Sequence, residues 1–153
     1  TTIVAFAMGV AIKSLLDLRL GVWIVRIFRF FPTRWLFRQK YPDLSGQWEN
    51  IWEAGGSNSY SAEKDRHSHP VMRQFGSYIY AEFINQQERF GFFGRISGEY
   101  IVGEWFHVAD SLGYFGAYQL KIINSSHLEG MWIGHSKTSA VIRADKSVWK
   151  KLK

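Results

Sequence analysis

The fold is decided by a five-residue pattern that occurs three times, as LSGQW (44–48), IVGEW (101–105) and LEGMW (128–132). In each copy an aliphatic residue, a glycine and a tryptophan stand two positions apart. Because side chains alternate between the two faces of a β-strand, these three residues share one face. That face is apolar, and its glycine leaves room beside a large indole. The pattern therefore predicts strands with one face turned into a core.

On either side of these copies, apolar and polar residues alternate in further short segments, and turn-forming residues such as Gly76-Ser77 and Ser97-Gly98 separate them. Eight short antiparallel strands at nearly even spacing favour a closed barrel, because closure removes exposed strand edges. The expected fold class is mainly β: a small up-and-down eight-stranded antiparallel β-barrel over residues 41–153, preceded by N-terminal apolar or transmembrane helices. We expect strands near residues 44–53, 70–76, 77–85, 89–97, 99–108, 113–123, 127–136 and 139–149, with 54–69 as one long loop.

The alternation also places several polar side chains inside the barrel. Asn50 and His107 continue the apolar face of their strands, Tyr118 lies on the corresponding face of its strand, and Ile142 is expected inside as well. A buried polar group without a partner costs ~1–3 kcal/mol. Asn50 and His107 therefore need a protein partner, a water molecule or a ligand.

Residues 1–40 carry the whole excess of positive charge. They hold seven Lys and Arg against one acidic residue, Asp17, whereas residues 41–153 hold twelve of each sign. The basic residues flank two apolar stretches, 3–16 and 20–31, and this combination favours anionic lipid as a partner. Because the predicted barrel is neutral overall, a long nucleic acid is not an expected partner.

The N-terminal segment predicts a helical membrane anchor over residues 1–40. The first apolar stretch makes only ~21 Å of helix, short of the ~30 Å bilayer core, so residues upstream of Thr1 or a snorkelling Lys13 would complete a span. Two arrangements stay open: a short transmembrane hairpin that turns near 17–21, or one span followed by a basic interfacial helix that ends at Pro32. The basic cluster 26–40 places the barrel on the cytoplasmic side if the anchor spans.

Signatures of catalysis and of metal binding are absent from the sequence. The chain has no cysteine, which excludes disulfides and thiolate chemistry, and it has no G-x-S-x-G elbow and no phosphate-binding glycine loop. His67-Ser68-His69 falls in the expected long loop rather than on a strand with metal-ligand spacing. We therefore expect no enzyme, no catalytic residue, no metal site and no cofactor.

A small barrel with aromatic walls and a few cations near its strand ends is suited to a small ligand. Nucleotide bases stack on aromatic rings, and guanidinium groups bind phosphates in a bidentate manner. An eight-stranded barrel has room for one such ligand at its mouth. A hydrophobic ligand of the lipocalin type fits an apolar interior equally well.

The order of these parts resembles the membrane-anchored β-barrel effectors of bacterial anti-phage cyclic-oligonucleotide signalling, the CBASS-type family with two transmembrane helices and a β-strand-rich domain. The resemblance is carried by the apolar N-terminal segment, then YPDLSGQWE (41–49), MRQF (72–75) and LEGMW (128–132). It implies a barrel at the bacterial inner membrane that binds a cyclic dinucleotide. Binding would control homo-oligomerisation and disruption of the membrane by the N-terminal helices, and the ligand would either activate or repress.

Seven residues are candidates for ligand contact. Strand alternation supplies Asn50, Trp105, His107 and Tyr118, whereas charge, together with the second-strand pattern that the resemblance implies, supplies Arg73, Gln74 and Arg143. Two alternative functions remain open at this point. One is a membrane-tethered, lipocalin-like carrier or sensor of an apolar small molecule, and the other is a structural or assembly barrel.

Overall fold

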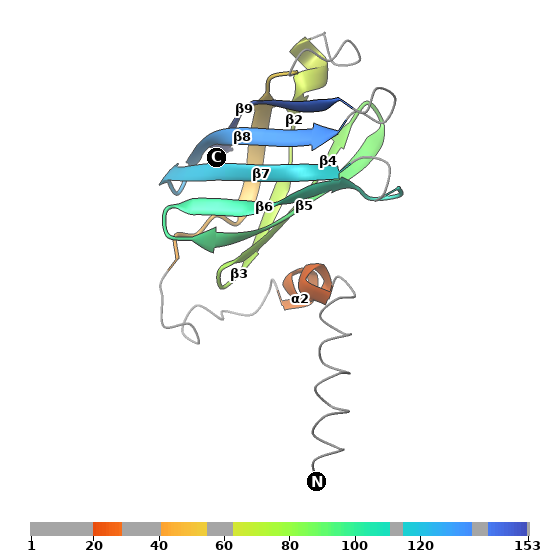
Figure 1. The fold of residues 1–153 in the computed structure, drawn as a ribbon. Coiled ribbons are helices and arrows are strands. Elements are labelled where there is room, and N and C mark those ends of the chain that lie inside the picture. Colours follow the sequence, from red (N-terminus) through yellow and green to blue (C-terminus); the bar gives the residue numbers. More distant parts are fainter. Residues whose placement is uncertain (1–19, 29–40, 55–62, 111–114, 136–140, 153) are drawn as a thin grey trace, which may run out of the picture.

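A computed structural model describes residues 20–28, 41–54, 63–110, 115–135 and 141–152 of the chain (Figure 1). Apart from helix α2 (Leu20–Phe28) and the short 3₁₀ helix η3 (Glu63–Arg66), its elements are β-strands. The strands are β1 (Gly46–Trp52), β2 (His67–Ser68), β3 (Val71–Phe75), β4 (Tyr78–Asn85), β5 (Glu88–Ser97), β6 (Tyr100–His107), β7 (Phe115–Asn124), β8 (His127–His135) and β9 (Ile142–Lys151).

The strands form one closed antiparallel barrel. From β3 to β9 each strand pairs with the next along the chain, and β9 returns to pair with β1. Strands β2 and β3 both pair with β1 in a single register, with Asn50 opposite Ser68 and Gly46 opposite Met72. They are thus two parts of one barrel strand, interrupted where Pro70 cannot donate a backbone hydrogen bond. The predicted eight-stranded up-and-down barrel is confirmed.

The two ends of the barrel differ in their connections. At the closed end, two-residue turns join β3 to β4, β5 to β6 and β7 to β8. Gly76 and Gly98 in two of these turns have φ of 60°, a backbone conformation that favours glycine. At the open end, longer connections follow β1, β6 and β8. We use the names closed end and open end for these two ends of the barrel.

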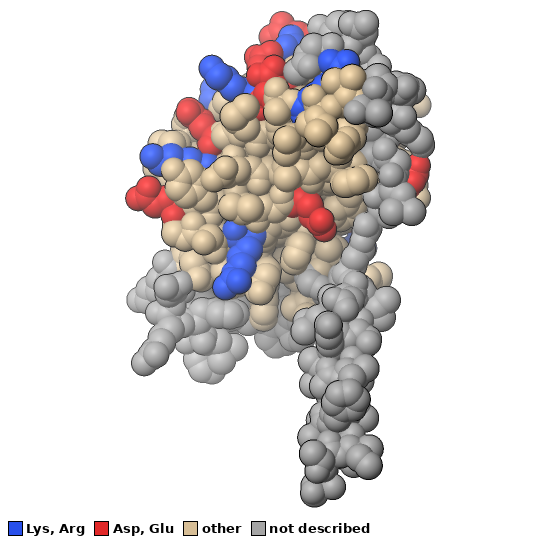
Figure 2. Space-filling view, in the orientation of Figure 1, with Lys and Arg blue, Asp and Glu red and all other residues tan. Residues whose placement is uncertain are grey.

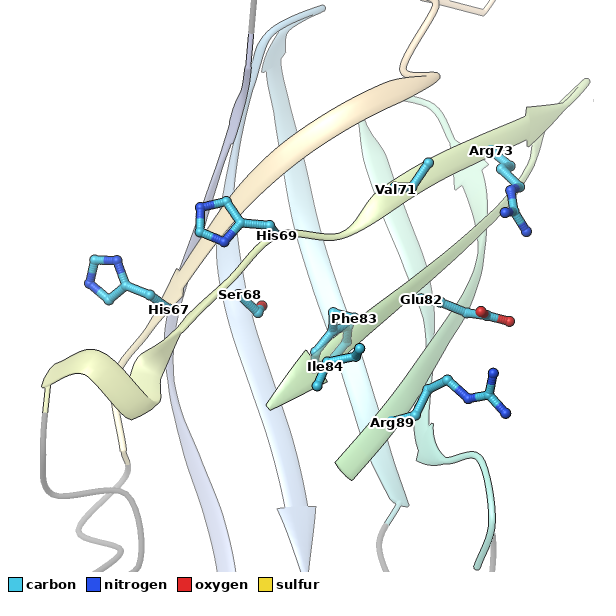
Figure 3. A pocket seen from close by; sticks show the side chains of 9 residues that line it. All are labelled: His67, Ser68, His69, Val71, Arg73, Glu82, Phe83, Ile84 and Arg89. Carbon is cyan, nitrogen blue, oxygen red and sulfur yellow. The ribbon is translucent and has the colours of Figure 1, made fainter. Parts of the chain in front are cut away.

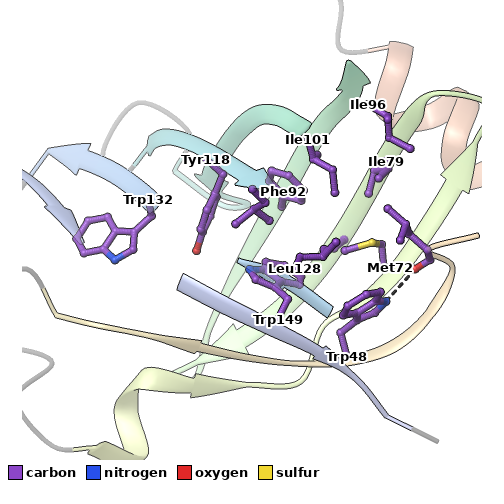
Figure 4. Close-up of a cluster of buried hydrophobic side chains, with 13 residues drawn as sticks. Trp48, Met72, Ile79, Phe92, Ile96, Ile101, Tyr118, Leu128, Trp132 and Trp149 are labelled. Atoms are coloured by element: carbon purple, nitrogen blue, oxygen red, sulfur yellow. Dashed lines mark hydrogen bonds between the residues drawn. The ribbon is translucent and has the colours of Figure 1, made fainter. Parts of the chain in front are cut away.

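The core fills the interior with the residues that the alternation predicted to face inward. Leu44, Trp48, Ile101 and Leu128 are fully buried, and the Trp48 indole Nε1 donates to the Leu44 carbonyl at 2.8 Å (Figure 4). This bond ties the start of β1 to the chain that enters it. The predicted facing of the three repeated segments is confirmed for these side chains.

The facing predicted for Ile142 is wrong. Its side chain is 59% exposed, because the β8–β9 register places Arg143 opposite the inward-facing Gly134. The same alternation along β9 brings Ser147 and Trp149 into the core, where both are fully buried. The apolar character of Ile142 thus gives the wrong phase for the beginning of β9.

Helix α2 packs on the outside of the barrel, over β3 and β4 (Figure 1). Val25 is buried in a small cluster with Tyr80 of β4 and Phe106 of β6. The Arg26 guanidinium lies 3.5 Å from a Glu82 carboxylate oxygen. Residues 20–28 of the predicted anchor therefore contact the barrel directly.

Within the described residues, no helix has both the length and the apolar character that crossing a membrane requires. The first predicted apolar stretch (3–16) and the basic segment 29–40 lie outside the described residues. The predicted transmembrane helices are therefore not observed in the part of the chain that the structure describes.

Gln87→Gly is expected to raise the free energy of unfolding by about 0.5–1 kcal/mol. Asn85 pairs with Glu88, so Gln86 and Gln87 form a two-residue hairpin loop, with φ of 48° and 68°. A residue with a Cβ atom is destabilised by ~1–2 kcal/mol at such positive φ values, and glycine removes this strain. The extra conformational freedom of glycine in the unfolded chain offsets part of the gain in stability. Urea unfolding followed by circular dichroism measures the change.

Gln119→Gly is the matched control, because Gln119 is an exposed glutamine in the regular strand β7. There glycine is expected to lower the stability by about 0.5–1 kcal/mol. A loss of stability in both variants would show that the β4–β5 turn stores no strain.

Candidate functional site

Aromatic side chains from several strands meet at the open end of the barrel. We call Trp52, Phe90, Trp105, His107 and Trp132 the mouth cluster. The Trp52 and Trp132 rings lie edge to face at 5.6 Å between centroids, and Trp105 lies 6.4 Å from Trp132. Phe90 contacts the His107 imidazole at 5.4 Å. Trp52, Trp105 and His107 are only partly buried, so the cluster presents aromatic surface at the mouth.

The Trp105 indole has a defined place because two glycines make room for it. Gly116 and Gly134 are opposite each other on β7 and β8, and a Cβ atom at either position would overlap the indole. Its Nε1 donates to the Ile133 carbonyl at 3.0 Å. Trp105 thus lies against the inner wall of the barrel, as the alternation predicts.

His107 offers a hydrogen-bond donor whose position is fixed. The backbone N–H of Asp110 donates to His107 Nδ1 at 2.9 Å, so the neutral imidazole carries its proton on Nε2. Among the described residues no hydrogen-bond partner meets Nε2. The mouth cluster therefore combines aromatic faces with one unused N–H donor.

A second set of side chains, linked by hydrogen bonds, lies deeper in the barrel. We call Asn50, Tyr118, Ser147 and Trp149 the inner cluster. The Ser147 hydroxyl donates to Asn50 Oδ1 at 2.9 Å, and Trp149 Nε1 donates to the Ser147 oxygen at 3.1 Å. The Tyr118 ring packs edge to face against Trp149 at 6.1 Å. Asn50, Ser147 and Trp149 are fully buried.

Burial raises the pKa of Tyr118 to about 12, an effect that the nearby Asn50 and then Ser147 side chains partly offset. Nevertheless Asn50 Nδ2 makes no hydrogen bond of ordinary geometry with the described residues, and neither does the buried Ser68 hydroxyl beside it on β2. Unpaired polar atoms in an interior create a demand for a water molecule or a ligand atom. The two unpaired polar atoms, Asn50 Nδ2 and the Ser68 hydroxyl, both lie where β1 pairs with β2.

Five of the seven predicted ligand residues share the inner face of the barrel. Trp105 and His107 belong to the mouth cluster, Asn50 and Tyr118 to the inner cluster, and the half-buried Arg143, which has an interaction partner, stands opposite Gly134 near the open end. The two clusters are adjacent, since Trp132 of the mouth cluster is opposite Tyr118 of the inner cluster in the β7–β8 register.

The structure separates Arg73 and Gln74 from this group. Gln74 lies at the closed end, where its Oε1 accepts from the Leu44 N–H and its Nε2 donates to the Gly76 carbonyl, both at 2.9 Å. Its amide is thus used to hold the chain that enters β1. Arg73 faces the outside of the barrel, because it is the neighbour of the inward-facing Gln74 and Met72 in an alternating strand.

Sequence reasoning missed Ser147 and Ser68 as members of the interior. Ser147 precedes the buried Trp149 by two residues, so the alternation of β9 itself contained the signal. Ser68 belongs to a strand of only two residues, which is too short for a period to be recognised.

A lateral pocket opens in the barrel wall beside β2. The β3–β4 ladder begins at Val71 opposite Glu82, and within the described residues β2 pairs with β1 but not with β4. The wall is therefore open next to β2, and a pocket of about 530 Å³ lies there (Figure 3). Its lining includes His67, Ser68, Arg73, Glu82, Ile84 and Arg89.

Comparison with known proteins identifies the barrel but no family. No protein-family model matches the chain, and no curated protein matches its sequence. Two crystal forms of apo shwanavidin have similar folds. The P21 form has a TM-score of 0.50 at 12% identity and covers 72% of this chain and 98% of its own, and the P1 form has a TM-score of 0.48 at 13% identity, over 76% and 100%. At such identity the likeness to the first form shows a shared barrel fold alone.

Proposed function

We propose that this protein is a binding module whose barrel takes a small planar ligand at its open end. The observation that carries the proposal is the mouth cluster, in which the partly buried Trp52 and Trp105 lie at the same end of the barrel as His107, whose Nε2–H has no partner among the described residues. A flat heterocycle gains stacking energy from such rings, roughly 1–3 kcal/mol for each base. The His107 donor would then select a ligand that carries an acceptor on the edge of its ring.

The ligand class that fits best is a cyclic dinucleotide. Its bases supply flat rings with acceptor atoms, and its phosphates are suited to the Arg143 guanidinium near the same end. The resemblance to the CBASS-type effectors supports the same class.

The interior counts against the apolar-ligand alternative. A lipocalin-like carrier calls for a fully apolar lumen, yet Asn50 and Ser147 are buried there and are hydrogen-bonded to each other. A purely structural barrel would not require a wall with unpaired polar atoms at Asn50 and Ser68. Both features favour a polar ligand.

The proposal extends to a membrane effector at the bacterial inner membrane, with the barrel on the cytoplasmic side. Helix α2 supports it, because the side of the helix away from the barrel exposes Trp23 and Ile27, at 55% and 58%. Together with Arg26 these residues suit the surface of an anionic bilayer. The ligand would activate or repress disruption of the membrane through a difference in its affinity for the resting and the assembled protein.

Self-association is supported by the outer face of β6, β7 and β8. Two neighbouring rows hold exposed apolar residues there: Val102 and Met131 lie on either side of Gln119 in one row, and Ala117 and Ile133 lie beside Glu104 in the next. In Figure 2 most of the central surface is free of charged side chains, which gather around it. Exposed apolar surface of this kind is typical of a protein interface.

His107→Ala is expected to weaken binding of the matching cyclic dinucleotide by about tenfold or more, because the ligand loses one hydrogen bond and an aromatic contact. Isothermal titration of the full chain with a panel of cyclic dinucleotides first identifies the ligand, and titration of the variant then measures the loss.

His127→Ala is the matched control, since His127 lies at the closed end beside Glu129. This variant is expected to bind like the unmodified protein. If no cyclic dinucleotide gives heat with a folded protein, or if the two variants lose affinity equally, the proposed site is wrong.

A further inference from the structure

Two arginines that line the lateral pocket have no ion-pair partner within the part of the chain that the structure describes. The side chains of Arg73 and Arg89 make no ion pair and no hydrogen bond with the described residues, although Glu82 lies between them in the view of Figure 3. Glu82 already has two partners of its own, the Arg26 guanidinium at 3.5 Å and the Tyr80 hydroxyl at 2.5 Å. The pocket lining thus holds two arginines and one glutamate that is already paired, which leaves a surplus of positive charge in the pocket.

A buried donor accompanies this charge. Ser68 lines the same pocket, is only 2% exposed, and its hydroxyl has no hydrogen-bond partner among the described residues. A buried hydroxyl without a partner is costly in a folded protein. Its position in the wall of a cationic pocket is explained if an acceptor atom occupies that pocket.

We propose that the lateral pocket binds an organic phosphate, with Arg73 and Arg89 holding its anionic groups and the Ser68 hydroxyl donating to an acceptor atom. Guanidinium groups are suited to phosphate because they form paired, charge-assisted hydrogen bonds. A pocket of about 530 Å³ has room for more than an inorganic ion. Arg73 contributes to this site from the outer face of the wall, whereas Ser68 lines the same pocket from its buried position opposite Asn50.

The same pocket is connected to helix α2 through Glu82. This residue lines the pocket and also pairs with Arg26 of the helix. A phosphate bound beside Glu82 repels its carboxylate and attracts the Arg26 guanidinium, so occupancy changes how α2 is held on the barrel. An anionic ligand in the pocket can thus act, through Glu82 and Arg26, on helix α2, which belongs to the predicted membrane anchor.

The experiment is calorimetric titration of the full chain with sodium pyrophosphate, for the unmodified protein and for Arg73→Gln, Arg89→Gln and Arg95→Gln. Arg95 is the control: it is an exposed arginine of β5 that lies 5.7 Å above the Tyr78 ring and does not line the pocket. Arg73→Gln and Arg89→Gln are expected to weaken binding about tenfold or more. Arg95→Gln is expected to bind pyrophosphate unchanged.

A second arm identifies the source of the phosphate. The same four proteins are sedimented with phosphatidylglycerol vesicles and with phosphatidylcholine vesicles. Loss of phosphatidylglycerol binding in Arg73→Gln and Arg89→Gln, but not in Arg95→Gln, assigns the pocket to a lipid headgroup, whereas loss of pyrophosphate binding alone assigns it to a soluble phosphate. If neither assay separates the pocket variants from Arg95→Gln, with all proteins folded by circular dichroism, the site is overturned. The mouth proposal is tested separately by His107→Ala.

Discussion

Trp149→Ala is expected to lower the free energy of unfolding by about 3–5 kcal/mol, which is the range for truncation of a buried aromatic side chain. Trp149 is fully buried, and its ring contacts Phe92 at 5.8 Å and Tyr118 at 6.1 Å. The truncation also removes the indole N–H that donates to the Ser147 hydroxyl. A domain of this size is stable by only about 5–15 kcal/mol, so the variant retains a small margin at most.

Trp23→Ala is the matched control, because the Trp23 indole lies on the exposed side of α2 at 55% exposure. Its contact with Arg26, at 5.8 Å from guanidinium to ring centroid, is of the solvent-exposed kind, which is worth about 0.5–1 kcal/mol. Urea unfolding of both variants, followed by far-ultraviolet circular dichroism, measures the difference. Equal losses in the two variants would mean that Trp149 is not part of a packed core.

The Trp149 experiment also tests the relation between the core and the inner cluster. Ser147 and Asn50 depend on each other for hydrogen bonds, and Trp149 completes their chain. If Trp149→Ala lowers the free energy of unfolding by more than about 5 kcal/mol, the excess measures the loss of the coupled polar network in addition to the cavity. Trp149→Phe, which fills most of the volume without the N–H, separates these two contributions.

The barrel was predictable from sequence because its strands follow one simple rule. In the three repeated segments the aliphatic residue and the tryptophan share a face, and the structure buries Leu44, Trp48, Ile101 and Leu128 together. The turns were marked by residues that tolerate positive φ or end a strand, such as Gly76 and Gly98. A period of two that is repeated eight times leaves few folds open other than a closed barrel.

The lateral pocket was not predictable, because it depends on an interruption of the strand. Residues 67–68 fall within the expected long loop, yet they pair with Asn50 and Ile51 of β1. A two-residue strand has no period to detect, and the pocket exists only because this strand does not pair with β4. Arg73 was selected for its charge, and the structure places that charge in the wall pocket instead of the mouth.

The behaviour of α2 illustrates a second limit of sequence reasoning. An apolar stripe beside arginines fits a lipid surface and a barrel surface equally well, because both bury the same side chains. In the structure Val25 is buried against the barrel, whereas Trp23 and Ile27 are exposed on the other side of the helix. Sequence alone indicates that the helix is amphipathic, whereas the partner of each face is decided by packing.

Raising the pH from about 9 to about 12 is expected to remove about 2 kcal/mol of stability through Tyr118 alone. Burial raises the pKa of this phenol from its ordinary value of 10.0 to about 12, so the folded protein holds the proton more tightly than the unfolded chain. The contribution is fully present below pH 10 and is lost as the pH rises through the folded pKa. Urea unfolding at a series of pH values measures it.

Tyr118→Phe keeps the ring in the core and removes the titrating group, so its stability is expected to fall less steeply over this pH range. Burial and then the hydrogen bond with Glu82 also raise the pKa of Tyr80. Tyr80 is present in Tyr118→Phe and in the unmodified protein alike. The difference in stability between these two proteins therefore reports on Tyr118. Tyr100→Phe, at an exposed position of β6, is expected to follow the unmodified protein. Parallel curves for Tyr118→Phe and the unmodified protein would mean that water reaches the inner cluster from the mouth or through the wall. Separated curves would instead show that the inner cluster is closed to water in the folded protein.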